Sequence, residues 1–226
     1  MTPRPGAPEH CGAGVEGYDS PEETGRIAAK LKEAGINLKY IDMDEPLWFG
    51  HYYNEKNACR STIEDVAERV AANLAAYHKL WPDVVIGDIE PVPSLTVQPN
   101  WQKDYQQWLQ AFQAHAGRPL AFMVLDIDWY NGRWEQNVQS MTNYLRDQHV
   151  KFAMIYNSGV TPTTTNDQYL DAAHQHFVHI ERDLHIVPDI ALFASWVRFP
   201  LRAISSPTER GQDFLVNEYV KLGNRR

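Results

Sequence analysis

The chain has 226 residues, a formal net charge of −8 and a pI of about 5.6. With 43% hydrophobic and 22% charged residues it has an ordinary globular composition and enough length to bury a sizeable core. The acidic balance argues against nucleic acid or an anionic membrane surface as a partner. No apolar run approaches the roughly 18 residues that a membrane helix needs.

Residues 1–9 are predicted to be a tail, and the N-terminal segment has no apolar stretch of the kind found in a signal peptide. The two cysteines, Cys11 and Cys59, are too few for a disulfide scaffold. Two alternatives stay open for them: a single disulfide between their loops, or two unrelated thiols.

Strand-like and helix-like segments alternate along the chain. The first helix has a typical beginning, with Ser20 as a capping residue, Pro21 in the first turn and two acids after it. In chain order we expect strand His10–Tyr18, helix Ser20–Ala34, strand Ile36–Asp44, helix Ser61–Leu80, strand Val84–Glu90, helix Trp101–Ala116, strand Leu120–Asp128, helix Gly132–Gln148, strand Lys151–Asn157, helix Asn166–Leu184, strand Ile190–Trp196 and helix Thr208–Leu222.

This alternation predicts βαβ units and a parallel sheet covered by helices. Polar and aromatic residues gather after the strands, where a (β/α)₈ barrel of TIM type has its active site. A doubly wound sheet is the competing architecture, but no Gly-rich phosphate loop follows any strand. Six strand–helix units out of eight predict an N-terminally truncated barrel, in one domain over residues 1–226. Its open edges would favour self-association.

Three strands end in the pattern acid, apolar residue, acid: Asp42/Asp44, Asp88/Glu90 and Asp126/Asp128. Side chains alternate faces along a strand, so each acid pair should point to one side. Carboxylates are rarely buried without partners, and three such pairs therefore predict a functional site.

The segment Asp44-Glu45-Pro46 resembles the Asn-Glu-Pro signature at the end of the fourth strand in retaining glycoside hydrolases of the large TIM-barrel clan. The resemblance implies that Glu45 is the general acid/base and that Trp196, after the last strand, stacks on sugar. The chain departs from the family pattern at two points. Asp44 replaces the family's Asn, and Tyr156-Asn157-Ser158 stands where the family's nucleophilic Glu ends the seventh strand.

Cleavage of a glycosidic bond in an oligo- or polysaccharide needs one protonated and one ionised carboxyl group. We predict Glu45 as the acid and Glu90 as base or nucleophile, with Asp128 in reserve. The other residues expected to contact the carbohydrate are Glu16, Asp44, Trp48, His51, Asp88, Asp126, Trp129, Tyr156, Asn157 and Trp196. The alternative for each acid is a structural role, capping a helix or pairing with an arginine.

Two other functions compete with hydrolysis. A barrel could bind carbohydrate without cutting it. Oxygen ligands from successive strands would also suit Mg²⁺ or Mn²⁺ in a metal-dependent TIM-barrel isomerase or lyase. Under the preferred hypothesis no metal or other cofactor is expected. The histidines at 174, 176, 179 and 185 are expected to form a solvated helix face.

Overall fold

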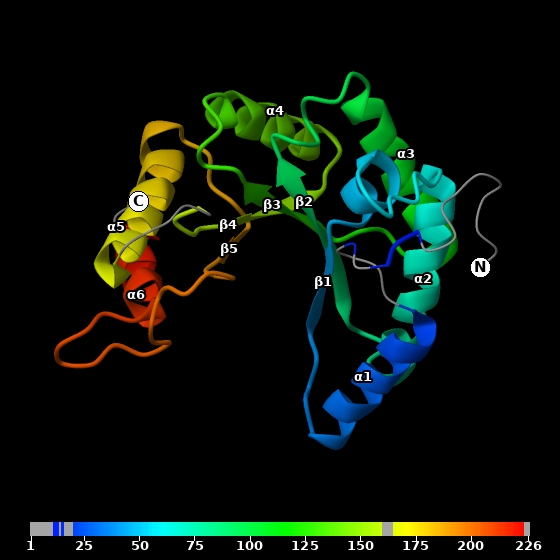
Figure 1. The fold of residues 1–226 in the computed structure, drawn as a ribbon, viewed down its shortest axis with the longest axis horizontal. Helices are drawn as coiled ribbons and strands as arrows, with labels where there is room; N and C mark the ends of the chain where they lie inside the picture. Colours follow the sequence, from blue (N-terminus) through cyan, green and yellow to red (C-terminus); the bar gives the residue numbers. More distant parts are fainter. Residues whose placement is uncertain (1–10, 14, 16–19, 160–164, 224–226) are drawn as a thin grey trace. The chain divides into compact units, whose positions relative to one another are not determined.

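The computed structural model describes residues 11–13, 15, 20–159 and 165–223 (Figure 1). The chain forms two compact units, Met1–Val124 and Leu125–Arg226. The boundary falls inside strand β3 (Phe122–Ile127).

The first unit contains three helices and two complete strands before β3. In chain order these are α1 (Pro21–Glu33), β1 (Tyr40–Asp44), the π-helical turn η1 (Trp48–Tyr52), α2 (Ile63–Leu80), β2 (Val85–Val92) and α3 (Trp101–Ala116). The second unit contains α4 (Trp134–Asp147), β4 (Lys151–Ile155), α5 (Asn166–Val178), the π-helical turn η2 (His179–Asp183), β5 (Ile190–Leu192) and α6 (Gln212–Gly223).

Local sequence signals determine where the helices begin and end. The hydroxyl of Ser20 accepts the backbone N–H of Glu23 at 3.1 Å, as its capping position predicts. Helix α2 begins with a reciprocal capping box between Thr62 and Asp65. Helix α3 ends at Gly117, whose φ of +70° is the left-handed conformation that glycine adopts without steric cost.

The strands form one sheet in the order β1-β2-β3-β4-β5, and β1 pairs with β2, and β4 with β5, in parallel. The register places Met43 beside Asp88. Neighbours in a parallel register point to the same face of the sheet, whereas residues one position away point to the other. Asp88 therefore shares its face with the buried Met43, and Asp42 and Asp44 lie on the opposite, exposed face.

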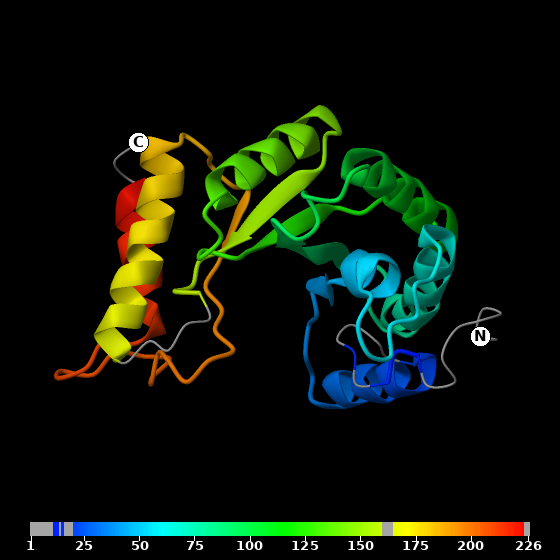
Figure 2. The same cartoon turned by 45° about the horizontal axis from the view of Figure 1, so that its top comes forward.

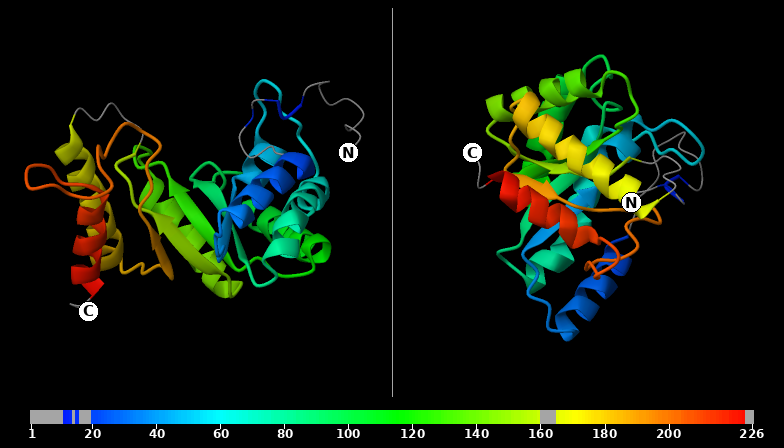
Figure 3. Two further views of the ribbon diagram at one scale, coloured as in Figure 1. Left: turned by 90° about the horizontal axis from the view of Figure 1, so that it is seen from below. Right: turned by 90° about the vertical axis from the view of Figure 1, so that its left-hand side faces the viewer.

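Each unit has its own apolar core. In the first unit α2 packs against both α1 and α3, burying Val66 and Leu74 among other residues of its inner face (Figure 1). In the second unit α5 and α6 lie side by side (Figures 2 and 3). An aromatic cluster packs around Phe177, with ring centroids 5.5–6.1 Å from those of Tyr156, Phe193 and Tyr219.

The predicted order of strands and helices is confirmed over the described residues, with most boundaries shifted by a few residues. The strand expected over His10–Tyr18 lies largely outside the described residues, and the described residues 11–13 form a turn. The predicted tail, residues 1–9, also lies outside them. The single domain and the self-association stay predictions. Among the described helices, none is long and apolar enough to cross a membrane.

Cys11 and Cys59 form a disulfide, one of the two alternatives that the sequence left open. Beside it, the backbone N–H of Gly12 donates to the carbonyl of Asn57 at 2.8 Å. The bridge thus ties the segment before α1 to the loop that leads into α2.

Candidate functional site

The end of β1 carries the carboxylate with the most unusual backbone. Glu45 has a φ of +44°, which residues other than glycine rarely adopt. Its N–H donates to the carbonyl of Ile89 at 3.1 Å, and its carbonyl accepts the N–H of Phe49 at 2.9 Å. Glu45 thus leaves the sheet and immediately begins a helical segment. Backbone strain of this kind, of order 1–3 kcal/mol, is concentrated at functional sites.

Glu90 holds the segment that follows Glu45. Its carboxylate is fully buried, and its oxygens accept the backbone N–H groups of Leu47 at 2.8 Å and Trp48 at 3.0 Å. Burial raises the pKa of Glu90 well above its usual range, and the nearby charges of Asp88 and Glu45 raise it further. Glu90 is the residue predicted from the sequence to be the base or nucleophile. In this structure its oxygens anchor the turn after the predicted acid.

Asp88 is fully buried on the helix-covered face of β2. Its oxygens accept the indole N–H of Trp108 at 2.7 Å and the hydroxyl of Tyr105 at 3.2 Å, both from α3. Burial raises the pKa of Asp88 above its usual range, against the lowering effect of these two hydrogen bonds. Both oxygens of this buried carboxylate accept hydrogen bonds from α3, and these bonds hold the helix against the sheet. This position does not support the predicted contact between Asp88 and substrate.

The segment after Glu45 carries partly exposed aromatic side chains. The rings of Trp48 and Tyr52 lie 6.1 Å apart, and the Nδ1 atom of His51 is 2.8 Å from the carbonyl of Ser61. The hydroxyl of Tyr52 donates to Asp104 at 2.7 Å. Burial and this bond raise the pKa of Tyr52 above its usual range. Sequence reasoning missed the Tyr52–Asp104 pair, because no local pattern links residues so far apart in the chain.

The predicted site residues of the second unit differ in their exposure to solvent. Asp128 is exposed at the end of β3, where its Oδ1 atom accepts the N–H of Tyr130 at 3.1 Å, and Asp126 is partly buried. Trp196 is 54% exposed. Trp129 is only 7% exposed, with its ring stacked on His176 at 3.9 Å between centroids. Of the two tryptophans, only Trp196 offers an open ring surface.

Asn157, at the position where the resemblance would require a nucleophile, is buried in a network. Its Oδ1 atom accepts both the indole N–H of Trp129 and the backbone N–H of Gly159 at 2.8 Å. Its carbonyl oxygen lies 2.8 Å from Nδ1 of His176. His176 is half-buried with its ring stacked on Trp129, so the expectation of a solvated face is wrong for this histidine. This burial lowers the pKa of His176.

Tyr156 is also buried, and its hydroxyl donates to Glu181 at 2.9 Å. This position does not support the predicted contact with substrate. Glu16, another predicted contact, lies outside the described residues. In the part of the chain that the structure describes, no group of three or more His, Cys, Asp or Glu side chains could hold a metal ion.

Comparison with known proteins gives a fold likeness only. No family model and no curated protein matches the chain. Among solved structures, GH10 from Paenibacillus barcinonensis is similar with a TM-score of 0.50 and 11% identity, over 89% of this chain and 69% of that one. An endo-1,4-β-xylanase from Caldicellulosiruptor owensensis has a TM-score of 0.49 and 8% identity, over 84% of this chain and 60% of that one. A GH10 endoxylanase from a sugarcane soil metagenome has a TM-score of 0.49 and 11% identity, over 88% of this chain and 66% of that one.

The chain therefore spans 60–69% of the length of these structures. At 11% identity, the likeness to the Paenibacillus barcinonensis structure establishes the fold and leaves the activity open. The fold is the parallel β/α fold of TIM-barrel type. The resemblance to TIM-barrel glycoside hydrolases inferred from Asp44-Glu45-Pro46 is confirmed as a resemblance of fold.

Proposed function

We propose that this glycoside hydrolase-like chain cleaves a glycosidic bond in an oligo- or polysaccharide, with Glu45 as the general acid. The observation that carries the proposal is the strained, left-handed backbone of Glu45 at the carboxyl end of β1. TIM-barrel enzymes have their catalytic residues at this end of the strands. A non-glycine residue keeps a costly conformation where the surrounding structure enforces it, and here Glu90 fixes the turn that follows.

The electrostatics of this edge act on Glu90. Burial raises its pKa most, and the charges of Asp88 and Glu45 raise it further. Glycosidic cleavage needs one protonated and one ionised carboxyl group, and Glu90 is the carboxyl group here whose environment favours the protonated form.

The role of the second carboxylate is divided between two candidates. Glu90 is buried and bonded to the backbone of Leu47, which supports a positioning role. The role of base or nucleophile, predicted from the sequence, is less favoured for this residue. Asp128, which is exposed at the end of its own strand in the second unit, stays the reserve candidate of the sequence hypothesis. Trp48, His51 and Trp196 are proposed as sugar contacts, because each is at least partly exposed.

The test is hydrolysis of a polysaccharide panel that includes xylan, followed by release of reducing ends. We expect Glu45→Gln to lower turnover at least about hundredfold. The same variant should lose much less activity on an aryl glycoside whose leaving group needs no proton, which separates acid catalysis from a general loss of structure. Thermal denaturation of each variant controls for folding. Full activity of Glu45→Gln on the polysaccharide would exclude the proposed role.

A second candidate function is carbohydrate binding without cleavage. It is favoured by the fact that Glu90 and Asn157, both at strand ends, are tied to neighbouring groups. Wild-type protein that binds oligosaccharides but releases no reducing ends would decide for this function.

A further inference from the structure

The loop between β5 and α6, residues 193–211, carries a cavity that none of the roles above uses. The loop is longer than the roughly 12–15 residues beyond which irregular connections are usually either functional or disordered. Together with the first turn of α5 it lines a cavity of about 650 Å³. This volume lies within the range of about 300–1,000 Å³ typical of ligand sites.

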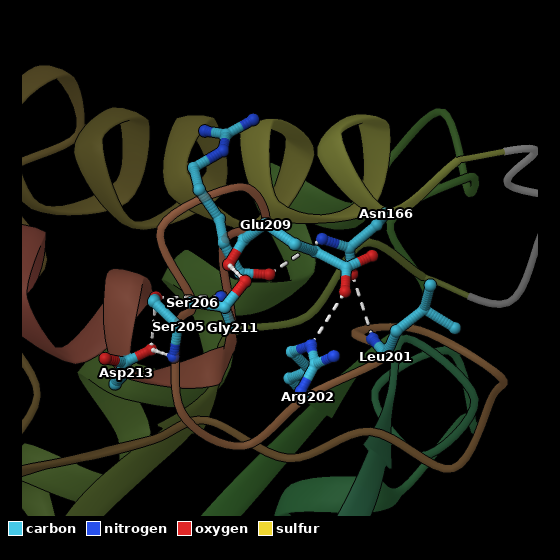
Figure 4. Close-up of polar contacts among 9 residues, drawn as sticks. Asn166, Leu201, Arg202, Ser205, Ser206, Glu209, Gly211 and Asp213 are labelled. Carbon is cyan, nitrogen blue, oxygen red and sulfur yellow. Dashed lines mark hydrogen bonds and ion pairs between the residues drawn. The ribbon is translucent and has the colours of Figure 1, made fainter.

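The loop is held in shape by its own hydrogen bonds (Figure 4). The carboxylate of Asp213 accepts both the backbone N–H and the hydroxyl of Ser205, at 2.8 and 2.6 Å. The hydroxyl of Ser205 in turn accepts the N–H of Gly211 at 2.9 Å. A Cβ atom on Gly211 would lie 2.7 Å from the backbone of Ile204, so the turn closes only with glycine.

Asn166 connects this loop to helix α5. Its side-chain oxygen accepts the N–H of Leu201 at 2.9 Å (Figure 4). Its amide donates to the carbonyl of Arg210 at 2.8 Å. These two hydrogen bonds hold the loop against α5 at Leu201 and at Arg210. Such preorganisation lowers the entropic cost of binding a ligand.

The three arginines of the loop differ in their charge partners. Arg202 pairs with Glu209 at 2.9 Å, and Arg210 pairs with Asp167 and Asp171 at 2.8 and 2.7 Å. Arg198 has no ion pair within the described residues, and its guanidinium lies 5.7 Å from the ring centroid of Phe199. Arg198 and Phe199 both line the cavity. Of the three arginines, Arg198 is therefore the one whose guanidinium forms no ion pair with a carboxylate in the part of the chain that the structure describes.

We propose that this cavity binds a carboxylate-bearing sugar, a uronic acid unit of a saccharide chain, with Arg198 as the partner of the carboxylate. A guanidinium presents paired N–H groups that match a carboxylate in a bidentate contact. Ser206, Thr208 and Glu209 supply polar groups for sugar hydroxyls, and Phe199 supplies an apolar surface. The inference rests on the proposed function for the carbohydrate class of the ligand, and it adds the acidic specificity.

The experiment is a direct binding titration, by calorimetry or by NMR, with a galacturonic acid trisaccharide. The matched ligand is the neutral galactose trisaccharide of the same linkage. We expect the acidic trisaccharide to bind at least roughly tenfold more tightly, because a charge-assisted bidentate contact is lost with the neutral sugar. Arg198→Gln should remove this preference.

Arg182→Gln is the control variant, because Arg182 is an exposed arginine of η2 and lies in the same unit but outside the cavity lining. It should bind the acidic trisaccharide as the wild type does, and so should Glu45→Gln, which separates failure of this site from failure of the proposed hydrolysis. Equal binding of the two trisaccharides, no binding of either, or an unchanged preference in Arg198→Gln would overturn the proposal. Binding of inorganic phosphate as tightly as the uronate would also overturn the proposal, because the cavity would then be a general anion site without specificity for a sugar.

Discussion

The Oε1 atom of Glu90 lies 2.8 Å from the backbone nitrogen of Leu47, two residues after Glu45. A side chain at the end of one strand thus orients the chain leaving its neighbour. Because Glu90 also accepts the N–H of Trp48, it satisfies two of the donors that a beginning helical turn leaves without partners. The position of Glu45 depends on this contact.

Glu90→Gln tests whether Glu90 positions the turn or takes part in chemistry. The amide of Gln can accept only one of the two N–H groups, so one buried donor loses its partner. We expect a loss of about 1–3 kcal/mol in the free energy of unfolding, measured by chemical denaturation, together with lower activity. A Glu90→Gln protein that keeps full stability but loses activity would contradict the positioning role and restore Glu90 as base or nucleophile.

Replacement of Glu45 should separate stability from function. The left-handed backbone at this position costs an L-residue about 1–2 kcal/mol relative to glycine. We expect Glu45→Gly to be about 1 kcal/mol more stable than Glu45→Ala, and both to be inactive. Both variants remove the same side-chain contacts, so the difference between them isolates the backbone term. Equal melting temperatures for the two would show that the turn relaxes and stores no strain.

The sequence was sufficient to predict the order of elements and the parallel class of the sheet. Capping residues, apolar periodicity and glycine stops act locally. The predicted cap is confirmed at Ser20, and Thr62 and Gly117 likewise begin α2 and end α3. Strand ends were overextended, as at Ile190–Trp196, where pairing stops at Leu192. An apolar run in the sequence does not reveal at which residue the backbone hydrogen bonds to the adjacent strand end.

The roles of the acids could not be predicted in the same way. Alternation along β2 correctly grouped Asp88 with Glu90, but which face they share depends on register with β1. That register puts Asp88 beside Met43, under Trp108, and not beside Asp42. The partners that bury these carboxylates come from α3 and from the turn after Glu45, which are distant in the sequence.

Asp88 should make stability depend on pH. Its pKa is higher in the folded protein than in the unfolded chain, because burial disfavours the charged form. Between the two pKa values the folded state therefore binds more protons, and the free energy of unfolding falls as the pH rises. We expect Asp88→Asn to gain stability relative to the wild type as the pH increases from about 4 to 8, with a slope of at most about 1.4 kcal/mol per pH unit. Denaturant titrations across this range measure the difference, and a constant difference would contradict the raised pKa.

Asn157 should be a stability residue of the second unit. Asn157→Ala leaves the indole N–H of Trp129 and the N–H of Gly159 without their acceptor, and we expect a loss of about 2–3 kcal/mol. Ser158→Ala is the matched control, since Ser158 is also buried and its hydroxyl donates to a single carbonyl, that of Gly159, among the described residues. It should lose less than about 1 kcal/mol. Chemical denaturation measures both losses, and similar losses in the two variants would argue against the shared-acceptor role.

The disulfide between Cys11 and Cys59 should stabilise the first unit. It closes a loop over a sequence separation of 48 residues, and in the chain-entropy model such a bridge contributes about 2–4 kcal/mol by restricting the unfolded chain. We expect a reducing agent to lower the melting temperature and to expose two titratable thiols. A double Cys11→Ser, Cys59→Ser variant should melt at the lower temperature with or without reductant, because it has no bridge to lose. If reductant lowers the melting temperature of this variant as well, the effect does not come from the disulfide. If the wild type already shows two thiols before reduction, the two cysteines are unpaired, and the segment before α1 is held only by contacts such as that between Gly12 and Asn57.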